Sequence, residues 1–205
     1  EIGHKVEYQT PPITVECWTK LFQKDRFNIL VAKNRKSSAD HWEIYSYAGS
    51  GEFSAYFPGY NAEIKSGVNI VDGNWHYVAM TFDGSTVELF VDGKMVKSAT
   101  VKKTGKDTST DAMWIGAYPE HSIGCAGVID EVRISKGIRK ISGVPTEVFK
   151  VDDETLGLWH LDELDNKRVS DVSKLQNAGV IRTPGQVQAN VPLTVTYRTA
   201  DPQLK

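Results

Sequence analysis

The chain has 205 residues, a formal net charge of −2 and a sequence pI near 6.2. It contains no run of five like charges, so we exclude nucleic acid and anionic lipid as main partners. No apolar run approaches the ~20 residues of a membrane span, which predicts no membrane insertion. Glu1 does not open a signal peptide, and we expect a mature or excised module.

The first elements predicted are two strands separated by Pro11-Pro12. Lys5–Tyr8 is a short strand pattern, and Thr14–Leu21 alternates between a core face and a second face that carries Trp18. The core face contains Ile13, Val15, Cys17, Thr19 and Leu21. Trp18 is a candidate sugar platform, although a tryptophan packed between long charged neighbours is the commoner case.

The most aromatic part of the chain follows, with strands predicted at Phe27–Ala32, Trp42–Tyr47 and Glu52–Tyr56. Strands prefer aromatic residues, so most of these rings should be packing. The loop after them is different because its Pro-Gly pair exposes Tyr60 beside Asn61. A ring that stacks next to an amide that bonds hydroxyls makes these two residues candidate carbohydrate contacts.

The clearest pattern in the chain is a hairpin. Two alternating strands, Trp75–Phe82 and Thr86–Val91, are joined by Asp83-Gly84, and Asp92-Gly93 follows the second strand. Asp-Gly between apolar runs is a strong hairpin signal, because primed turns need positive φ where glycine has no steric penalty. An antiparallel core is therefore predicted.

Further strands are predicted along the rest of the chain. Thr100–Ser109 is rich in Lys and Thr, which favours an edge strand running into a loop. Ala112–Gly116 and Val128–Ile134 are strand patterns. If the strand at Thr14–Leu21 pairs with Val128–Ile134, Glu16 and Arg133 could form a structural ion pair across the non-core face.

These pieces carry a resemblance. The pattern D-G-x-W-H-x-V-A, then V-E-L-F-V-D-G, I-G and I-D-E-V-R-I resembles the laminin-G-like, pentraxin-related branch of the concanavalin A-like superfamily. The matching positions run from Thr14 to Ile134, about two thirds of the chain. The resemblance implies an all-β, antiparallel β-sandwich jelly roll, and it indicates fold more strongly than function.

The resemblance also suggests ligand sites. Ala117–Ser122 lies where pentraxins carry a cluster of acidic calcium ligands, but this chain has only Glu120 there. Tyr118, Glu120 and His121 are candidate carbohydrate contacts, against an ordinary solvated loop. Related β-glucanases use a similar D-x-V-R strand for a structural Ca²⁺, which implies Asp130 as a metal ligand, with a carbonyl from the turn at Gly51.

The C-terminal part contains G-L-W-H-L-D-E, then Asp171-Val172-Ser173 and Asn177-Ala178-Gly179, a motif that normally opens such a module. Either a second copy begins at Leu156, or residues 152–205 supply a permuted or closing strand to a single domain over 1–205. We favour the second, because an isolated strand pair could not bury its apolar face. Leu193–Arg198 would add one more strand. Cys17 and Cys125 are expected to be free, buried thiols.

The resemblance also implies a test for an enzyme: retaining β-glucanases of this fold carry E-x-D-x-x-E on one strand, so that the acid and the nucleophile enter one groove. The nearest match, Glu163 to Arg168, has arginine at the last position, and other catalytic motifs are missing from the sequence. We therefore predict a non-catalytic, secreted, cell-surface or periplasmic carbohydrate-binding module within a larger protein. The alternative is a protein-interaction, adhesion or spacer module, and a glycoside hydrolase is less favoured.

Overall fold

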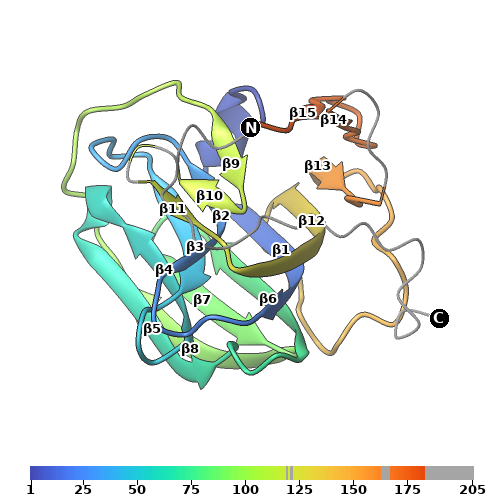
Figure 1. Ribbon diagram of the computed structural model, residues 1–205. Coiled ribbons are helices and arrows are strands. Elements are labelled where there is room, and N and C mark those ends of the chain that lie inside the picture. The colour runs from blue at the N-terminus through green and yellow to red at the C-terminus, as the bar shows by residue number, and fades with distance from the viewer. Residues whose placement is uncertain (119, 121, 163–166, 183–205) are drawn as a thin grey trace.

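Two antiparallel β-sheets stack face to face in the computed structural model, which describes residues 1–118, 120, 122–162 and 167–182 (Figure 1). The larger sheet has the order β13-β12-β1-β6-β7-β8, with bounds Thr155–Trp159, Gly127–Lys136, Ile13–Leu21, Trp75–Phe82, Thr86–Val91 and Lys94–Thr100. The smaller sheet has the order β5-β4-β3-β2-β9, with bounds Ala62–Asn69, Glu52–Phe57, Trp42–Ser46, Asn28–Lys33 and Met113–Ile115. The predicted antiparallel β-sandwich is confirmed.

Smaller elements decorate the sandwich. Two short hairpin-like pairs are β10 with β11 and β14 with β15, with bounds Ala117–Tyr118, Ile123–Gly124, Arg168–Val169 and Gly179–Val180. The helical segments are η1 and η2, at Val6–Gln9 and Pro58–Tyr60. Both are single 3₁₀ turns, so the described chain has no helix with the length and apolar character that crossing a bilayer requires.

The predicted hairpin is present with the expected bounds. In its turn, the carboxylate of Asp83 accepts hydrogen bonds from the backbone N–H groups of Ser85 and Thr86, both at 2.7 Å. In the next turn, Asp92 and Gly93 have φ angles of +50° and +73°, as a primed turn requires. These turns set the pairing of β6, β7 and β8.

The core lies between the sheets and follows the alternation of β1. Ile13, Val15, Cys17 and Leu21 belong to the main buried cluster, together with inward-facing side chains of the smaller sheet such as Phe53. Burying each large apolar side chain contributes roughly 1.5–3 kcal/mol. Residues at the intervening positions of β1 therefore face outward from the sandwich.

A β-bulge changes the phase of β12. Glu16 lies opposite Arg133 but Trp18 lies opposite Asp130, so β12 has one residue more than β1 between these pairs. Glu131 lies in the bulge with a φ of +51°. Without this bulge, strict alternation would put Asp130 on the same face as the core residues of β12.

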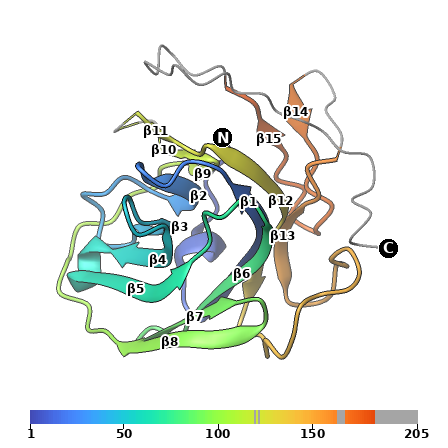
Figure 2. The same ribbon diagram turned by 60° about the horizontal axis from the view of Figure 1, so that its bottom comes forward.

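The strand β13 extends the larger sheet beyond β12 (Figure 2). The ring of Trp159 is fully buried in the main core. The carboxylate of Asp171 accepts hydrogen bonds from the backbone N–H groups of Leu158, Ser173 and Asn177, at 2.8 to 3.0 Å. The C-terminal motif thus fixes β13 against the sandwich, whereas the domain organisation over 1–205 stays a prediction.

Two predicted strands are wrong. In place of the strand at Lys5–Tyr8, Val6–Gln9 form the 3₁₀ turn η1, in which only Tyr8 is buried. The edge strand is Lys94–Thr100 instead of Thr100–Ser109, because β8 continues directly from the Asp-Gly turn after β7. Residues 101–112 contain no strand and are held by loop contacts, such as the N–H of Gly105 to the carbonyl of Gly59 at 2.8 Å.

Other expectations have mixed outcomes. The strand β5 was not predicted, and its outward-facing side chains include the charged residues Glu63 and Lys65. Cys17 and Cys125 are both free thiols, the first fully buried and the second half-buried. The predicted strand Leu193–Arg198 lies outside the described residues.

Candidate functional site

The outer face of the smaller sheet carries aromatic and charged side chains on three adjacent strands. Tyr56 in β4 lies between Glu43 in β3 and Glu63 in β5 in the strand register. Two residues beyond Glu43 in β3, the hydroxyl of Tyr45 donates a hydrogen bond to Glu63 at 2.8 Å. This face therefore combines aromatic rings with carboxylates, and we call it the aromatic face.

The centre of the aromatic face holds a buried polar pair. His41 and Glu43 are only 1% and 2% exposed, and their atoms Nε2 and Oε2 lie 3.5 Å apart. The ammonium of Lys36 covers this pair, 3.1 Å from Oε1 of Glu43. The same ammonium lies 5.6 Å from the ring centroid of Tyr56 and 5.1 Å from that of Tyr118.

The hydrogen bonding of this pair is incomplete. Nδ1 of His41 lies 2.9 Å from the carbonyl of Asn34, which can only accept, so this nitrogen carries a proton. The other ring nitrogen, Nε2, faces Oε2 of Glu43 at 3.5 Å, which is beyond ordinary hydrogen-bond length. Neither atom has a hydrogen-bond partner. Unsatisfied buried polar atoms are costly and rare, which marks the pair as a candidate site.

Tyr118 closes one side of the aromatic face from β10. Its hydroxyl accepts a hydrogen bond from the N–H of Lys36 at 2.7 Å and donates one to Glu120. Burial raises the pKa of the Tyr118 hydroxyl. The Tyr118 side chain is only 2% exposed, while Glu120 is exposed beside it, and the role of both residues as carbohydrate contacts stays a prediction. His121 lies outside the described residues.

More accessible rings lie at the other side of the aromatic face. Phe27 is 37% exposed and packs edge-to-face on Tyr47, with centroids 5.1 Å apart. The ammonium of Lys65 lies 3.2 Å from the centroid of the Tyr47 ring. These rings extend the aromatic surface away from the buried His41–Glu43 pair.

The predicted contacts Tyr60 and Asn61 lie in a different place. The Tyr60 ring packs edge-to-face on Phe57 and Phe82 at 6.0 and 5.2 Å, so part of it belongs to the core. Asn61 is exposed, with a φ of +49°, and its N–H bonds the carbonyl of Pro58. A role of these two residues in carbohydrate binding stays a prediction.

Trp18 lies on the outer face of the larger sheet. Its ring is half-buried and packs on Tyr77, with centroids 5.8 Å apart, and its Nε1 is buried without a hydrogen-bond partner. Residues 137–154, which we call the strap, cross this face and bring Ile141 and Phe149 onto the same cluster. Trp18 is therefore packed against neighbouring side chains, and its role as a sugar platform stays a prediction.

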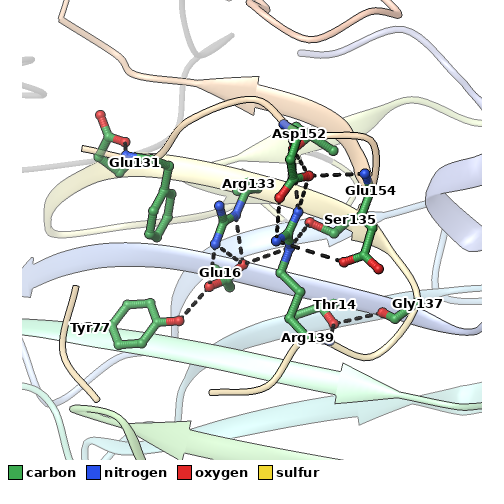
Figure 3. A network of polar contacts seen from close by, with 12 residues as sticks. Thr14, Glu16, Tyr77, Glu131, Arg133, Ser135, Gly137, Arg139, Asp152 and Glu154 are labelled. Atoms are coloured by element: carbon green, nitrogen blue, oxygen red, sulfur yellow. Dashed lines mark hydrogen bonds and ion pairs between the residues drawn. The ribbon is translucent and has the colours of Figure 1, made fainter. Parts of the chain in front are cut away.

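A polar cavity of about 660 Å³ lies between the strap and the larger sheet, where Glu16, Tyr77 and Arg133 line it. Glu16 is 1% exposed, and Figure 3 shows it between the other two. The Arg133 guanidinium donates to both Glu16 oxygens, at 2.8 and 3.0 Å, and the Tyr77 hydroxyl donates at 2.5 Å. The predicted ion pair is confirmed, and its carboxylate is fully hydrogen-bonded.

Arg139 fastens the beginning of the strap. Its guanidinium donates to both carboxylate oxygens of Asp152 at 2.8 and 2.6 Å and to Ser135 at 2.5 Å (Figure 3). This pairing holds the pKa of Asp152 well below its ordinary value. The backbone N–H of Phe149 donates to Glu131 at 2.7 Å and fixes the far part. These hydrogen bonds and ion pairs therefore fix both ends of the strap against the larger sheet.

The predicted calcium ligands Asp130 and Gly51 lie in different parts of the fold. Asp130 lies opposite Trp18 in β12, and one carboxylate oxygen accepts the N–H of Glu131 at 2.9 Å. Gly51 lies in the turn before β4, and its carbonyl accepts the N–H of Ile70 at 2.9 Å. Among the described residues, no three Asp, Glu, His or Cys side chains are arranged so that they could hold a metal ion. A calcium at Asp130 would need carbonyls and water as further ligands, and it stays a prediction.

Of residues 163–168, which are the nearest match to the glucanase motif E-x-D-x-x-E, positions 163–166 lie outside the described residues. Arg168, which replaces the second glutamate, is exposed in β14. This strand belongs to a separate two-stranded pair instead of either large sheet.

The sequence comparison identifies the class of protein. Residues 2–140 match the Concanavalin A-like lectin/glucanases superfamily, which covers more than half of the chain. The chain therefore belongs to this superfamily, as the motifs predicted. The match ends within the strap, so most of the strap and β13 lie beyond it.

Solved structures with a similar fold share little sequence with this chain. A candidate carbohydrate-binding protein from Bacteroides ovatus is 13% identical with a TM-score of 0.63, and the match covers 85% of this chain and 55% of that one. This chain thus spans about half the length of that protein. A pentraxin from Limulus polyphemus is 14% identical (TM-score 0.46; 62% and 65% covered). Domains LG4-5 of mouse laminin alpha1 are 18% identical (TM-score 0.47; 64% and 37% covered).

Sequence reasoning missed the centre of the aromatic face. His41, Glu43 and Lys36 come from one stretch, but their partners Tyr56 and Tyr118 come from β4 and β10. One signal was available, because Glu43 interrupts an otherwise apolar and aromatic strand. A charged residue in such a strand requires a partner, so Glu43 by itself indicates a polar site on this face.

Proposed function

We propose that this chain is a non-catalytic carbohydrate-binding module that acts outside the cytoplasm, as part of a larger multidomain protein. The aromatic face is the proposed binding surface. The observation that carries the proposal is the buried His41–Glu43 pair, whose unsatisfied atoms lie below aromatic rings in a member of a lectin superfamily. The carbohydrate-binding description of the Bacteroides ovatus neighbour agrees with it.

The chemistry of the aromatic face suits a sugar. The half-buried ring of Tyr56 and the exposed ring of Phe27 offer apolar surface to the C–H face of a pyranose. Glu63, at 41% side-chain exposure, and the exposed Glu120 can accept hydrogen bonds from hydroxyl groups. A few placed polar groups around aromatic surface are typical of ligand sites.

A glycan array and a polysaccharide pull-down test the proposal, run with calcium and with EDTA. Binding that Tyr56→Leu weakens would support the aromatic face. Binding that Tyr56→Leu leaves intact but Tyr60→Ala abolishes would move the site to the loop after β4. Silence across both assays in both conditions would overturn the carbohydrate proposal.

One observation favours the alternative of a protein-interaction module. The strap exposes the apolar side chains of Ile138, Val144, Val148 and Val151, at 38 to 47%. Exposed apolar side chains gathered on one segment are a feature of interaction surfaces. Sedimentation tests this version, because a strict monomer over a wide concentration range would exclude self-assembly through the strap.

A further inference from the structure

The aromatic face contains a cation site that the chain fills with its own lysine. The ammonium of Lys36 lies over the rings of Tyr56 and Tyr118, at 5.6 and 5.1 Å, and 3.1 Å from Glu43. Two aromatic faces and a carboxylate are the groups that recognise ammonium ions in proteins. The arrangement is therefore specific for a positively charged nitrogen.

The charge of the surroundings points the same way. The side chains around this site include three carboxylates, those of Glu43, Glu63 and Glu120, against the two ammonium groups of Lys36 and Lys65. Glu43 is buried, and a buried carboxylate requires a positive partner. If Lys36 moved away, the site would require another cation.

Lys36 is able to leave. Its side chain is 27% exposed, whereas that of Glu43 is 3% exposed, so the ammonium approaches from the solvent side. A lysine side chain has four rotatable bonds, and its ordering in one position costs conformational entropy. Oε2 of Glu43 and Nε2 of His41 remain without hydrogen bonds even with Lys36 in place. Lys36 thus satisfies the pair only in part.

We propose that the glycan recognised by the aromatic face carries a free amino group, and that its ammonium takes the position of the Lys36 ammonium. This inference rests on the proposed carbohydrate-binding function and narrows it to amino sugars. The ligand ammonium lies over Tyr56 and Tyr118 and pairs with Glu43, while the sugar ring covers His41.

Calorimetric titration of the whole chain with three oligosaccharides of equal length tests this proposal. Glucosamine oligomers carry the ammonium, N-acetylglucosamine oligomers have it blocked, and cello-oligosaccharides have a hydroxyl in its place. Glucosamine oligomers should bind about tenfold more tightly than either of the others, and added salt should weaken their binding.

Two substitutions locate the effect. Lys36→Met removes the internal competitor and should tighten glucosamine-oligomer binding by about threefold to tenfold. Lys97→Met, which removes an exposed lysine of β8 in the other sheet, is the matched control and should change nothing. Glu43→Gln keeps the shape but removes the charge, and it should abolish the preference for the amine.

The outcomes separate the two proposals. Equal binding of all three oligosaccharides, with no effect of Lys36→Met, would overturn the amino-sugar inference and leave the carbohydrate function standing. Binding of none of them or of any other glycan, by the wild type or by Lys36→Met, would overturn both. Thermal unfolding of each variant with and without ligand shows that the variants are folded.

Discussion

The two outer faces of the sandwich each contain a buried carboxylate, and the two are handled in opposite ways. Glu16 on the larger sheet receives hydrogen bonds from Arg133 and Tyr77 on both of its oxygens (Figure 3), and residues of the strap line the cavity next to it. Glu43 on the smaller sheet keeps one oxygen without a hydrogen bond and is covered by a lysine side chain.

The difference helps to distinguish a buried charge that serves the fold from a buried charge that serves a ligand. A fully bonded pair such as Glu16 with Arg133 is explained by the fold, because it holds adjacent strands and supports the strap. An incompletely bonded group such as Glu43 costs free energy that the fold itself does not recover. The aromatic face is therefore the better candidate for a site that a ligand completes.

The largest effect that would sharpen this comparison is the loss of Arg133. Arg133→Met leaves Glu16 buried without its main partner and should lower the free energy of unfolding by about 3–5 kcal/mol. Urea unfolding measures this loss. In the double variant Glu16→Gln with Arg133→Met, much of the lost stability should return. If Arg133→Met alone cost no more stability than the loss of an exposed arginine, the structural role of the pair would be contradicted.

Binding should respond on the opposite face. Tyr56→Leu removes a ring of the aromatic face and should weaken glycan binding by about 1–2 kcal/mol with little change in unfolding. Tyr77→Phe is the matched change on the larger sheet. It removes the hydroxyl bonded to Glu16 and should cost about 1 kcal/mol of stability without affecting binding. The reverse pattern would assign the binding site to the strap side.

Calcium binding at Asp130 would weaken the comparison, because Asp130 lies on the outer face of the larger sheet and a ligand would then bind to that face as well. If calcium binds there, saturation at tenfold its dissociation constant should add about 1.4 kcal/mol of stability over EDTA. Asp130→Asn should remove this increment. Equal melting temperatures with calcium and with EDTA would contradict the proposed metal site.

The smallest expected effect is a pH dependence of the strap side. A hydrogen bond to Glu131 raises the pKa of His160 above its ordinary value of 6.5. Its contribution is therefore complete below the unfolded pKa and is lost as pH rises through the folded one. The free energy of unfolding should therefore be higher at about pH 5.5 than at about pH 8.5, by roughly a few tenths of a kcal/mol. His160→Gln should abolish this difference. If the pH dependence of unfolding were unchanged in His160→Gln, it would have to come from another group.

The sequence predicted the parts of the fold that depend on local chemistry. Asp83-Gly84 and Asp92-Gly93 require particular backbone angles, so the hairpins could be read directly. The alternation in Thr14–Leu21 separated core from surface, because one face of that strand is apolar. The pairing of Glu16 with Arg133 followed from the strand order that the resemblance implied.

The parts that failed depend on contacts distant in sequence. The burial of Tyr118 depends on its packing beside the stretch around Lys36 and His41, which no local pattern encodes. The strand β5 was missed because its outward side chains Glu63 and Lys65 are charged. The bulge at Glu131 was invisible because a continuous strand pattern runs through it.

The contact between the strap and the turn after β7 also bears on the order of folding. A Cβ atom built on Gly93 would lie 2.3 Å from the carbonyl carbon of Gly143, so backbone rests on backbone there. The strap can seat only after this turn has taken its left-handed conformation, whereas the hairpin needs nothing from the strap. The strap should therefore dock late and open first, and its amides should exchange with solvent well before those of β6 and β7.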